Sequence, residues 1–193
     1  MKKRIVIFAS GSGTNTQNLI QYFQHKEIAE VFLVLSNKKD AKVLDRAKNL
    51  NINTLHFSKS ELFSSEGIVK TLEAAKPDLI VLAGFLLKFP EHILKQYPNR
   101  VINLHPALLP KYGGKGMYGS YVHEAVVLNK EKETGITIHY VNENYDEGAI
   151  IFQKSVELSE KDTATIVAEK VHELEYRYFP KVVEEVLLED SKK

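Results

Sequence analysis

The sequence of 193 residues contains no cysteine. This absence excludes disulfide bonds, thiol nucleophiles and cysteine-based metal sites. It agrees with a reducing compartment, and we expect a cytoplasmic protein. Long apolar runs are also absent, since no stretch approaches the roughly 20 residues that a membrane-spanning helix needs. We therefore expect no association with membranes.

Neither sign of charge is in excess. Lysine and arginine total 26 against 25 acidic residues, which gives a net charge of +1. The chain thus lacks the strong field that attracts nucleic acid, and we expect no nucleic-acid partner. A basic start at Met1 precedes an apolar run, but the run ends at Ala9 without a cleavage site, so no signal peptide is expected. The length and the 44% content of hydrophobic residues fit one globular domain over residues 1–193.

Short apolar runs alternate with helical periodicity over the first hundred residues. Continuous apolar runs are typical of strands buried on both faces, and their alternation with helices predicts a parallel sheet covered on both sides. Asp40 is expected to cap the second helix, and Pro90 to begin the fourth. The expected strands are residues 5–9, 31–35, 54–57, 78–83 and 101–104, and the expected helices are residues 15–24, a segment with Val43, Leu44 and Ala47, residues 60–75, and a segment with Ile93 and Leu94.

The pattern changes after residue 130. Alternation over residues 135–141, and a second such segment at 149–158, predict an antiparallel pair added to the sheet. Residues 162–188 have the periodicity of a long helix, which Pro180 is expected to kink or split. Its apolar stripe is expected to consist of Val167, Val171, Leu174 and Tyr178. The fold class is therefore α/β: an open, mostly parallel twisted sheet with helices on both faces, a C-terminal antiparallel extension and a long terminal helix.

The run Val101 to Pro110, Val-Ile-Asn-Leu-His-Pro-Ala-Leu-Leu-Pro, is the most informative part of the chain. Strand alternation places Asn103 and His105 on the same side of a strand at its end. An amide donor and a titratable ring are both useful beside a carbonyl that becomes an oxyanion. Such residues are also common in structural roles, so this run alone leaves both interpretations open.

The segment Gly11-Ser12-Gly13-Thr14-Asn15 lies between the first expected strand and the first expected helix. Glycines let backbone N–H groups approach an anion, and a helix N-terminus favours a phosphate. Thr16 stands where the dinucleotide fingerprint has its third glycine, and the phosphate-loop lysine is absent, so NAD and ATP are not expected. The loop favours a small phosphate group, and a plain tight turn is the alternative.

Two further segments are candidates for the same site. Asp146 lies in the turn Tyr-Asp-Glu-Gly; if it reaches His105, it orients the imidazole ring and raises its pKa. The glycine-rich segment from Lys111 to Ser120 is a candidate lid, although a surface loop has the same composition. The remaining histidines show no metal spacing, and no metal is expected: His25, His56, His92, His123, His139 and His172.

Three groups of residues follow one another at characteristic spacings. They are the glycine loop at 11–15, the run Asn-Leu-His-Pro-Ala-Leu-Leu-Pro-Lys-Tyr-Gly at 103–113, and Thr137-Ile-His139 followed by Asp-Glu-Gly-Ala-Ile-Ile at 146–151. With these motifs the chain resembles the phosphoribosylglycinamide formyltransferases, which are formyltetrahydrofolate-dependent enzymes with a Rossmann-like fold. Ser-Asn-Lys at 36–38 and Leu-Ala-Gly-Phe at 82–85 also match, so the resemblance covers nearly the whole chain.

The resemblance implies a role for each matched position. The catalytic residues would be Asn103, His105 and Asp146, and the substrate phosphate would bind to Gly11, Ser12, Gly13, Thr14 and Asn15. Glu175 would contact the glycinamide end of the substrate, and His172 shares its helix face three residues earlier. The folate would be held by Leu86, Leu87, Lys88, Phe89, Asn103, Asn142 and Asp146. Leu87 stands where relatives can carry arginine, which leaves Lys88 as a possible substitute.

The reaction implied is formyl transfer from 10-formyltetrahydrofolate to the amine of glycinamide ribonucleotide in de novo purine biosynthesis. Residues 1–100 would form the phosphate-binding half, and residues 101–193 the catalytic and folate-binding half. We expect small-molecule substrates, no metal, and a monomer or homodimer. The alternatives are a formyltetrahydrofolate hydrolase, a methionyl-tRNA or sugar-nucleotide formyltransferase core, and an inactive folate- or nucleotide-binding module.

Overall fold

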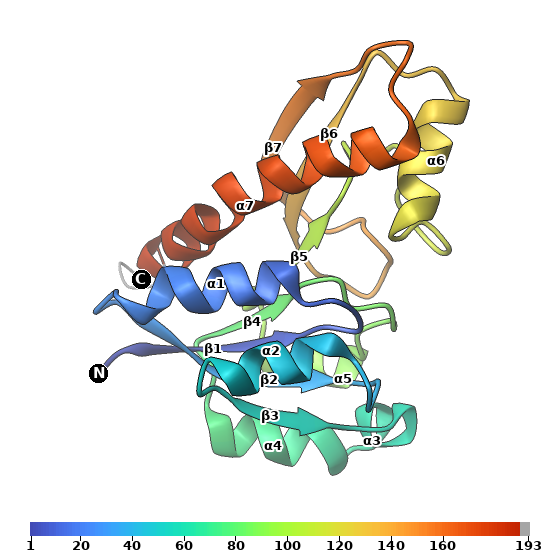
Figure 1. The fold of residues 1–193 in the computed structure, drawn as a ribbon. Coiled ribbons are helices and arrows are strands. Elements are labelled where there is room, and N and C mark those ends of the chain that lie inside the picture. The colour runs from blue at the N-terminus through green and yellow to red at the C-terminus, as the bar shows by residue number, and fades with distance from the viewer. Residues whose placement is uncertain (190–193) are drawn as a thin grey trace.

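The computed structural model describes residues 1–189, which contain a sheet of seven strands flanked by helices (Figure 1). The strand order is β3-β2-β1-β4-β5-β6-β7, parallel from β3 through β5 and antiparallel for β6 and β7. The strands are β1 (Lys3–Phe8), β2 (Ala29–Ser36), β3 (Asn53–His56), β4 (Leu79–Leu82), β5 (Val101–His105), β6 (Glu133–Tyr140) and β7 (Ile150–Glu157). The predicted fold class is therefore confirmed; residues 190–193, the end of the predicted domain, lie outside the described part.

The helices form one layer on each face of this sheet. The helices are α1 (Thr14–Gln24), α2 (Lys42–Asn49), α3 (Lys59–Phe63), α4 (Gly67–Ala75), α5 (Glu91–Gln96), α6 (Ser120–Leu128) and α7 (Ala164–Glu189). Buried residues of α1, α2, α6 and α7 join one core cluster, and those of α3, α4 and α5 join another. α6 lies where the sequence pattern predicts no helix.

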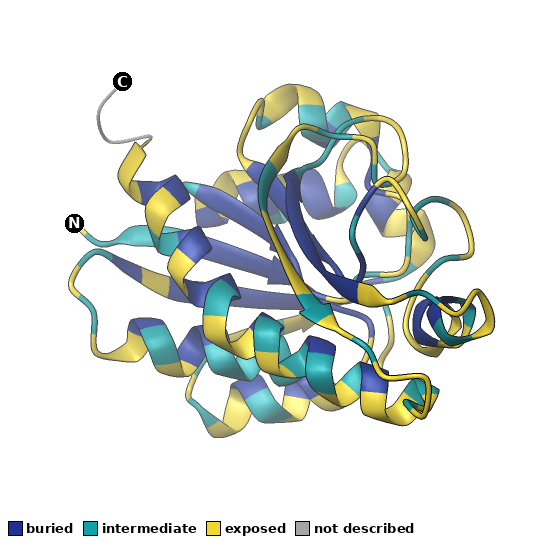
Figure 2. Cartoon of the chain, turned by 90° about the horizontal axis from the view of Figure 1, so that it is seen from above, coloured by how far each residue is buried: buried dark blue, intermediate teal, exposed yellow. Residues whose placement is uncertain are grey.

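Alternation along β1 divides the core between these two layers. Ile5 and Ile7 belong to the cluster that contains α1 and α7, whereas Val6 and Phe8 belong to the cluster that contains α4. All four side chains are fully buried, as the dark strands in Figure 2 show for the centre of the sheet. Burial of one such side chain contributes roughly 1.5–3 kcal/mol. The continuous apolar run thus has the two-sided burial that its composition predicted.

Two expectations about local structure were wrong. The predicted helix at 60–75 is divided into α3 and α4, because Ser64 adopts an extended backbone with φ −76° and ψ 141°. The capping box of Ser58 and Glu61 fixes the start of α3. Asp40 does not cap α2, whose N-cap is Ala41. The carbonyl of Gly11 instead accepts a hydrogen bond from the first-turn N–H of Val43 at 3.2 Å.

Pro180 does not split α7, which runs through it without interruption. A proline inside a helix leaves the carbonyl four residues earlier without its N–H partner. The side-chain amide of Asn18 on α1 donates to that carbonyl, of Tyr176, at 3.0 Å. Val167 and Val171 of the predicted stripe are buried, whereas Leu174 and Tyr178 are only half-buried. The core positions that follow Val171 are instead Glu175, Phe179, Val182, Val183, Val186 and Leu187.

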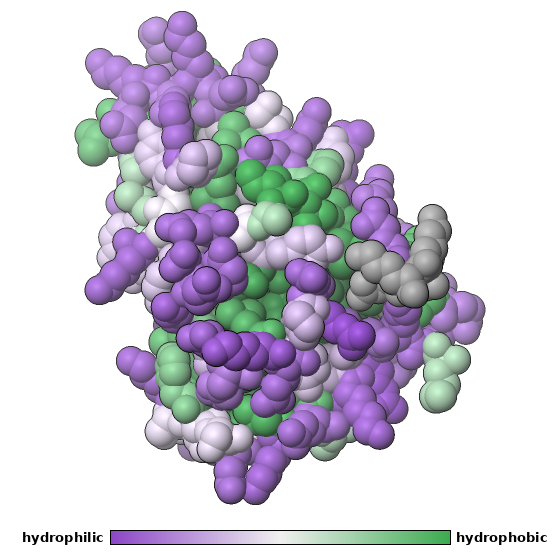
Figure 3. All heavy atoms as spheres, turned by 180° about the vertical axis from the view of Figure 1, so that it is seen from behind, coloured by the Kyte–Doolittle hydropathy of each residue, from purple (hydrophilic) through white to green (hydrophobic). Residues whose placement is uncertain are grey.

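The face seen from behind carries many polar side chains. Figure 3 shows one face, on which apolar patches in the middle are interrupted and surrounded by hydrophilic side chains. Within residues 1–189, no helix combines the length and the apolar character that crossing a membrane requires.

Candidate active site

A cavity of about 610 Å³ opens at the carboxyl ends of β1, β4 and β5. In an open α/β sheet this edge is where ligands bind, because loops and helix N-termini meet there. The cavity gathers four segments of the chain, which are the loop 10–15, the segment 83–86, the end of β5 at 103–106 and the loop 114–119, together with Lys38, His123, Tyr145, Asp146, His172 and Glu175. The predicted catalytic, phosphate-binding and Glu175 positions therefore all line one space.

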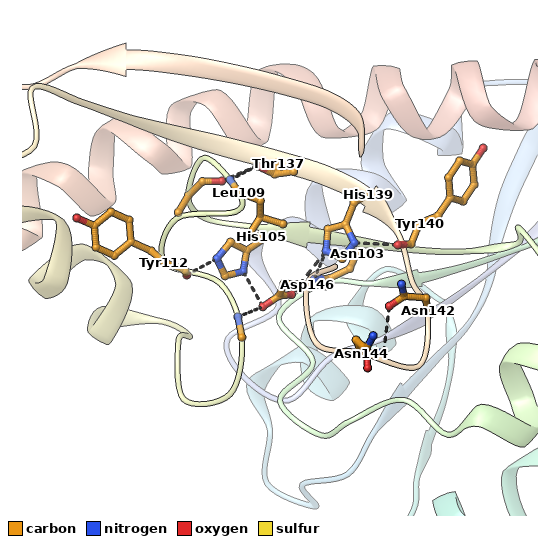
Figure 4. Close-up of polar contacts among 12 residues, drawn as sticks. Asn103, His105, Leu109, Tyr112, Thr137, His139, Tyr140, Asn142, Asn144 and Asp146 are labelled. Atoms are coloured by element: carbon orange, nitrogen blue, oxygen red, sulfur yellow. Dashed lines mark hydrogen bonds and ion pairs between the residues drawn. The ribbon is translucent and has the colours of Figure 1, made fainter. Parts of the chain in front are cut away.

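Asn103 and His105 lie on the same side of β5, as their spacing predicted (Figure 4). The sheet register pairs Asn103 with His139 and His105 with Thr137. His105 is 4% exposed, and its Nε2 lies 2.8 Å from the carbonyl oxygen of Tyr112. A carbonyl oxygen only accepts, so Nε2 carries the proton and donates. The other ring nitrogen, Nδ1, is left to face the cavity side.

The carboxylate of Asp146 is the centre of the cluster. One oxygen, Oδ2, lies 3.7 Å from His105 Nδ1 and accepts a hydrogen bond from the backbone N–H of Gly114 at 2.9 Å. The other oxygen accepts from Asn103 Nδ2 at 3.4 Å. Gly148 holds the Asp146 turn against β6, since any Cβ there would overlap the carbonyl oxygen of Tyr140. The predicted approach of Asp146 to His105 is thus present.

Burial sets the protonation of both groups. Desolvation lowers the pKa of His105 below its ordinary value of 6.5, and it outweighs the opposite effect of Asp146. The expectation of a raised imidazole pKa was therefore wrong. For Asp146, burial raises the pKa, but the nearby ring of His139, the proximity of His105 and the Gly114 N–H together lower it from 3.8. At neutral pH the pair is a neutral imidazole beside a carboxylate.

His139 is a further member of this cluster. The residue pattern alone had predicted no function for His139. It is 2% exposed, and its Nδ1 donates to the carbonyl oxygen of Tyr140 at 2.9 Å. Its Nε2 then accepts from Asn103 Nδ2 at 3.1 Å, which fixes the orientation of the Asn103 amide. The alternation of β6 could have located His139, because it directly faces Asn103 across the two strands.

Residues of α2 hold the glycine loop in place. Gly13 is the N-cap of α1 with φ 77°, and a Cβ there would overlap Val43 of α2. Arg46 of α2 donates from Nε to the carbonyl oxygen of Ser12 at 2.9 Å, and it also bonds the side chain of Gln17. The loop thus presents its backbone to the cavity with a guanidinium behind it. Thr14 and Asn15 do not cap the helix with their side chains.

Those two side chains instead reach α7. Asn15 Nδ2 donates to Glu175 Oε2 at 2.8 Å, and Thr14 Oγ1 lies 3.1 Å from His172 Nε2. Glu175 is 6% exposed, and burial raises its pKa above 4.5, although Asn15 and His172 act in the opposite direction. The Oδ1 of Asn15 is buried without a hydrogen-bond partner among residues 1–189. A solvated surface role for Glu175 is therefore excluded.

The positions assigned to the folate differ in their surroundings. Leu86 lines the cavity, and its N–H donates to Ser10 Oγ at 3.0 Å. Phe89 instead packs edge-on against Phe8 in the core, at a centroid distance of 5.2 Å. Leu87 is half-buried and Lys88 exposed. The side chain of Asn142 accepts from the N–H of Asn144 at 3.0 Å, so it shapes the turn that carries Asp146.

The glycine-rich loop borders the cavity opposite β5. Its residues 114–119 line the cavity, and its base is tied to the cluster by Tyr112 and Gly114, as described above. Lys38 and His123 also line the cavity, although no motif in the sequence predicted a function for either. No group of three or more potential metal ligands occurs within the described residues.

Comparison with known proteins identifies the family. A family model described as formyl transferase matches residues 3–183. The chain belongs to the formyl transferase family. Among curated members, phosphoribosylglycinamide formyltransferase of Bacillus subtilis is 32% identical over 96% of this chain and 95% of its own length. The chloroplastic phosphoribosylglycinamide formyltransferase of Arabidopsis thaliana is 35% identical over 94% of this chain, which spans 64% of that relative's length.

Solved structures of formyl transferases share the fold. The crystal structure of phosphoribosylglycinamide formyltransferase from Bacillus halodurans superposes with a TM-score of 0.86 at 35% sequence identity. The match covers 96% of this chain and 95% of that one. The resemblance drawn from the motifs is thus confirmed.

Proposed function

We propose that this formyl transferase moves the formyl group of 10-formyltetrahydrofolate to the amine of glycinamide ribonucleotide, as a cytoplasmic step of purine biosynthesis. Relatives of 32% and 35% identity with the matching name support this substrate pair. One structural observation carries it: Asn103, His105 and Asp146 meet in the same cavity as the glycine loop at 11–15. A phosphorylated acceptor can therefore be anchored at one end while its other end reaches the reacting groups.

The acceptor lies, in this proposal, along the α1–α7 side of the cavity. Its phosphate accepts from backbone N–H groups at the start of α1, where the helix dipole favours an anion. Arg46 adds positive charge behind the loop through its contact with Ser12. Glu175 and Asn15 offer buried acceptors to the hydroxyl or amine groups of the glycinamide end. The buried carboxylate and the unpartnered amide oxygen support this placement, because such acceptors are costly without donors.

The donor approaches from the side of Leu86 and the turn at 142–146. Backbone groups of residues 86–89 and of this turn are proposed to hold the pterin, with Tyr145 and Leu86 supplying apolar surface. A cavity of about 610 Å³ lies in the range of roughly 300–1,000 Å³ that is usual for small-molecule sites. Phe89 acts indirectly here, because its side chain stabilises the segment from the core.

The chemistry is an acyl transfer in which no bond to the protein forms. The acceptor amine attacks the formyl carbon, the C–N bond to the folate breaks, and the amine proton passes to the departing folate nitrogen. Asn103 Nδ2 keeps one hydrogen on His139, which orients the amide, and its second hydrogen moves from the 3.4 Å bond with Asp146 to the oxyanion. His105 faces Asp146 through Nδ1, so a proton taken up there makes an imidazolium beside the oxyanion. Asp146, through His105 or a water molecule, relays the proton.

The test is a formylation assay with the purified chain. Glycinamide ribonucleotide and 10-formyltetrahydrofolate should yield the formylated nucleotide and tetrahydrofolate in equal amounts. Separate reactions with no acceptor, with methionyl-tRNA and with an amino-sugar nucleotide distinguish the alternatives. Formate release without acceptor would indicate a hydrolase, and transfer only to another acceptor would replace the proposed substrate. Binding of both ligands without turnover would indicate an inactive binding module.

A further inference from the structure

His123 of α6 is a buried polar residue that the chemistry described above does not use. The buried face of this helix consists of Val122, His123 and Val126. His123 is 8% exposed, and its Nδ1 is fully buried with no hydrogen-bond partner among residues 1–189. Its ring lines the main cavity. A group that only filled space between two valines would be apolar, since an unsatisfied polar atom is costly.

The surroundings of His123 restrict the kinds of chemical group that it can bind. Its pKa is lowered from 6.5 first by burial and then by two neighbouring imidazoles, those of His172 and His105. His172 contacts Thr14 and Glu175 on the acceptor side, whereas His105 belongs to the reacting cluster. His123 thus lies within electrostatic range of both ends of the cavity. A neutral imidazole donates one hydrogen bond and accepts another, which suits a hydroxyl or an amide better than a phosphate.

We infer that His123 is a binding residue for the acceptor, contacting a hydroxyl or amide group between its phosphate and its reactive amine. The inference rests on the proposed function, which supplies an acceptor with both kinds of group.

The test compares three variants by calorimetry with glycinamide ribonucleotide and, separately, with inorganic phosphate. His123→Leu keeps the bulk and removes the polar atoms, so affinity for the nucleotide should fall about tenfold, the effect of one hydrogen bond, while phosphate affinity stays unchanged. His123→Asn, which keeps an amide near the position of Nδ1, should recover most of the loss. His92→Leu is the matched control, because His92 also has a buried unpartnered nitrogen but does not line the cavity.

The outcomes separate this inference from the proposed function. Unchanged nucleotide affinity in His123→Leu, or an equal loss for inorganic phosphate, overturns the role of His123. Absence of nucleotide binding in the unsubstituted protein overturns the proposed function instead. If His123→Leu does not fold, His123→Ala provides the comparison, and a nucleotide affinity equal to that of the unsubstituted protein counts against the inference. The Michaelis constant for 10-formyltetrahydrofolate should not change in any variant, since the contact is with the acceptor.

Discussion

The polar groups of the reacting cluster share one carboxylate, that of Asp146. Asn103, His105, His139 and the backbone of Gly114 all contact Asp146 within 3.7 Å. A change at any of these groups therefore alters the position or charge of the others.

Removal of the reacting side chains should abolish most of the turnover. His105→Ala and Asn103→Ala should each lower kcat by about 10²-fold or more, the usual effect of losing an oxyanion-stabilising group. Circular dichroism and thermal melting should show that both variants remain folded. His56→Ala at an exposed position of β3 is the control with the same type of substitution. Full turnover in a folded His105→Ala protein would show that the cluster is not the active site.

Glu175 should act on one substrate only. Because its carboxylate is buried and bonded to Asn15, Glu175→Ala removes an acceptor from the acceptor side of the cavity. The Michaelis constant for glycinamide ribonucleotide should rise at least tenfold, and that for 10-formyltetrahydrofolate should stay nearly constant. Glu173→Ala, exposed on the same helix, should change neither constant. Equal effects on both substrates would mean that Glu175 supports the fold instead of the acceptor.

At the scale of elements, the glycine loop is fixed between α1 and α2. Gly13→Ala introduces a Cβ at φ 77° that overlaps Val43, so we expect a loss of about 2 kcal/mol or more in unfolding free energy. Gly11→Ala should cost much less, because no atom lies within 4 Å of its added Cβ. Chemical denaturation measures both values. Similar losses in the two variants would contradict the packing of the loop on α2.

A charged substitution at Gly11 tests the proposed phosphate site. Gly11→Asp places a carboxylate in the loop without steric conflict, so it should weaken nucleotide binding more than tenfold by repulsion. Affinity for 10-formyltetrahydrofolate should persist, because the donor is placed on the Leu86 side. Calorimetry with each ligand measures the two affinities. An unchanged nucleotide affinity in Gly11→Asp would show that the phosphate does not bind at this loop. Gly13→Asp would be a poorer test, because its Cβ also overlaps Val43 of α2.

For the whole molecule, the buried histidines predict how stability depends on pH. Burial lowers the pKa of His105 and of His123 below 6.5, so the unfolded chain binds protons at a pH where the native state does not. The contribution of these two histidines to the free energy of unfolding is fully present above about pH 6.5, and it is lost as the pH falls toward their native pKa values. The lowered pKa of Asp146 adds a loss below 3.8, whereas the raised pKa of Glu175 acts in the opposite direction.

The melting temperature should therefore fall between about pH 7.5 and pH 5.5. The double variant His105→Leu/His123→Leu should show a smaller fall, because it lacks the two groups that must take up protons on unfolding. His56→Leu, at an exposed position, should show the same fall as the unsubstituted protein. Scanning calorimetry at the two pH values measures the difference. An undiminished fall in the double variant would assign the pH dependence to other groups.

Much of the fold follows from local patterns in the sequence. Apolar runs such as Ile5 to Ala9 predicted the strands, because a segment buried on both faces must be apolar throughout. The antiparallel pair and the long terminal helix were predicted from strand alternation and helical periodicity. The division between α3 and α4 and the unbroken helix at Pro180 were not predicted. The division follows from the extended backbone at Ser64, and the unbroken helix is accompanied by the bond from Asn18 of α1; helical periodicity contains neither.

The candidate site shows the same division. The sequence by itself determined which polar residues end β5 and that Asn103 and His105 share a side, because strand alternation is a local property. Only the tertiary structure decided that His139 orients Asn103, that His123 reaches the cavity, and that burial lowers the pKa of His105 despite Asp146. Burial and cross-strand contact join residues distant in sequence. The extent of desolvation depends on everything packed around a group. The direction of the net pKa shift of His105 could therefore not be derived from its neighbours in the chain.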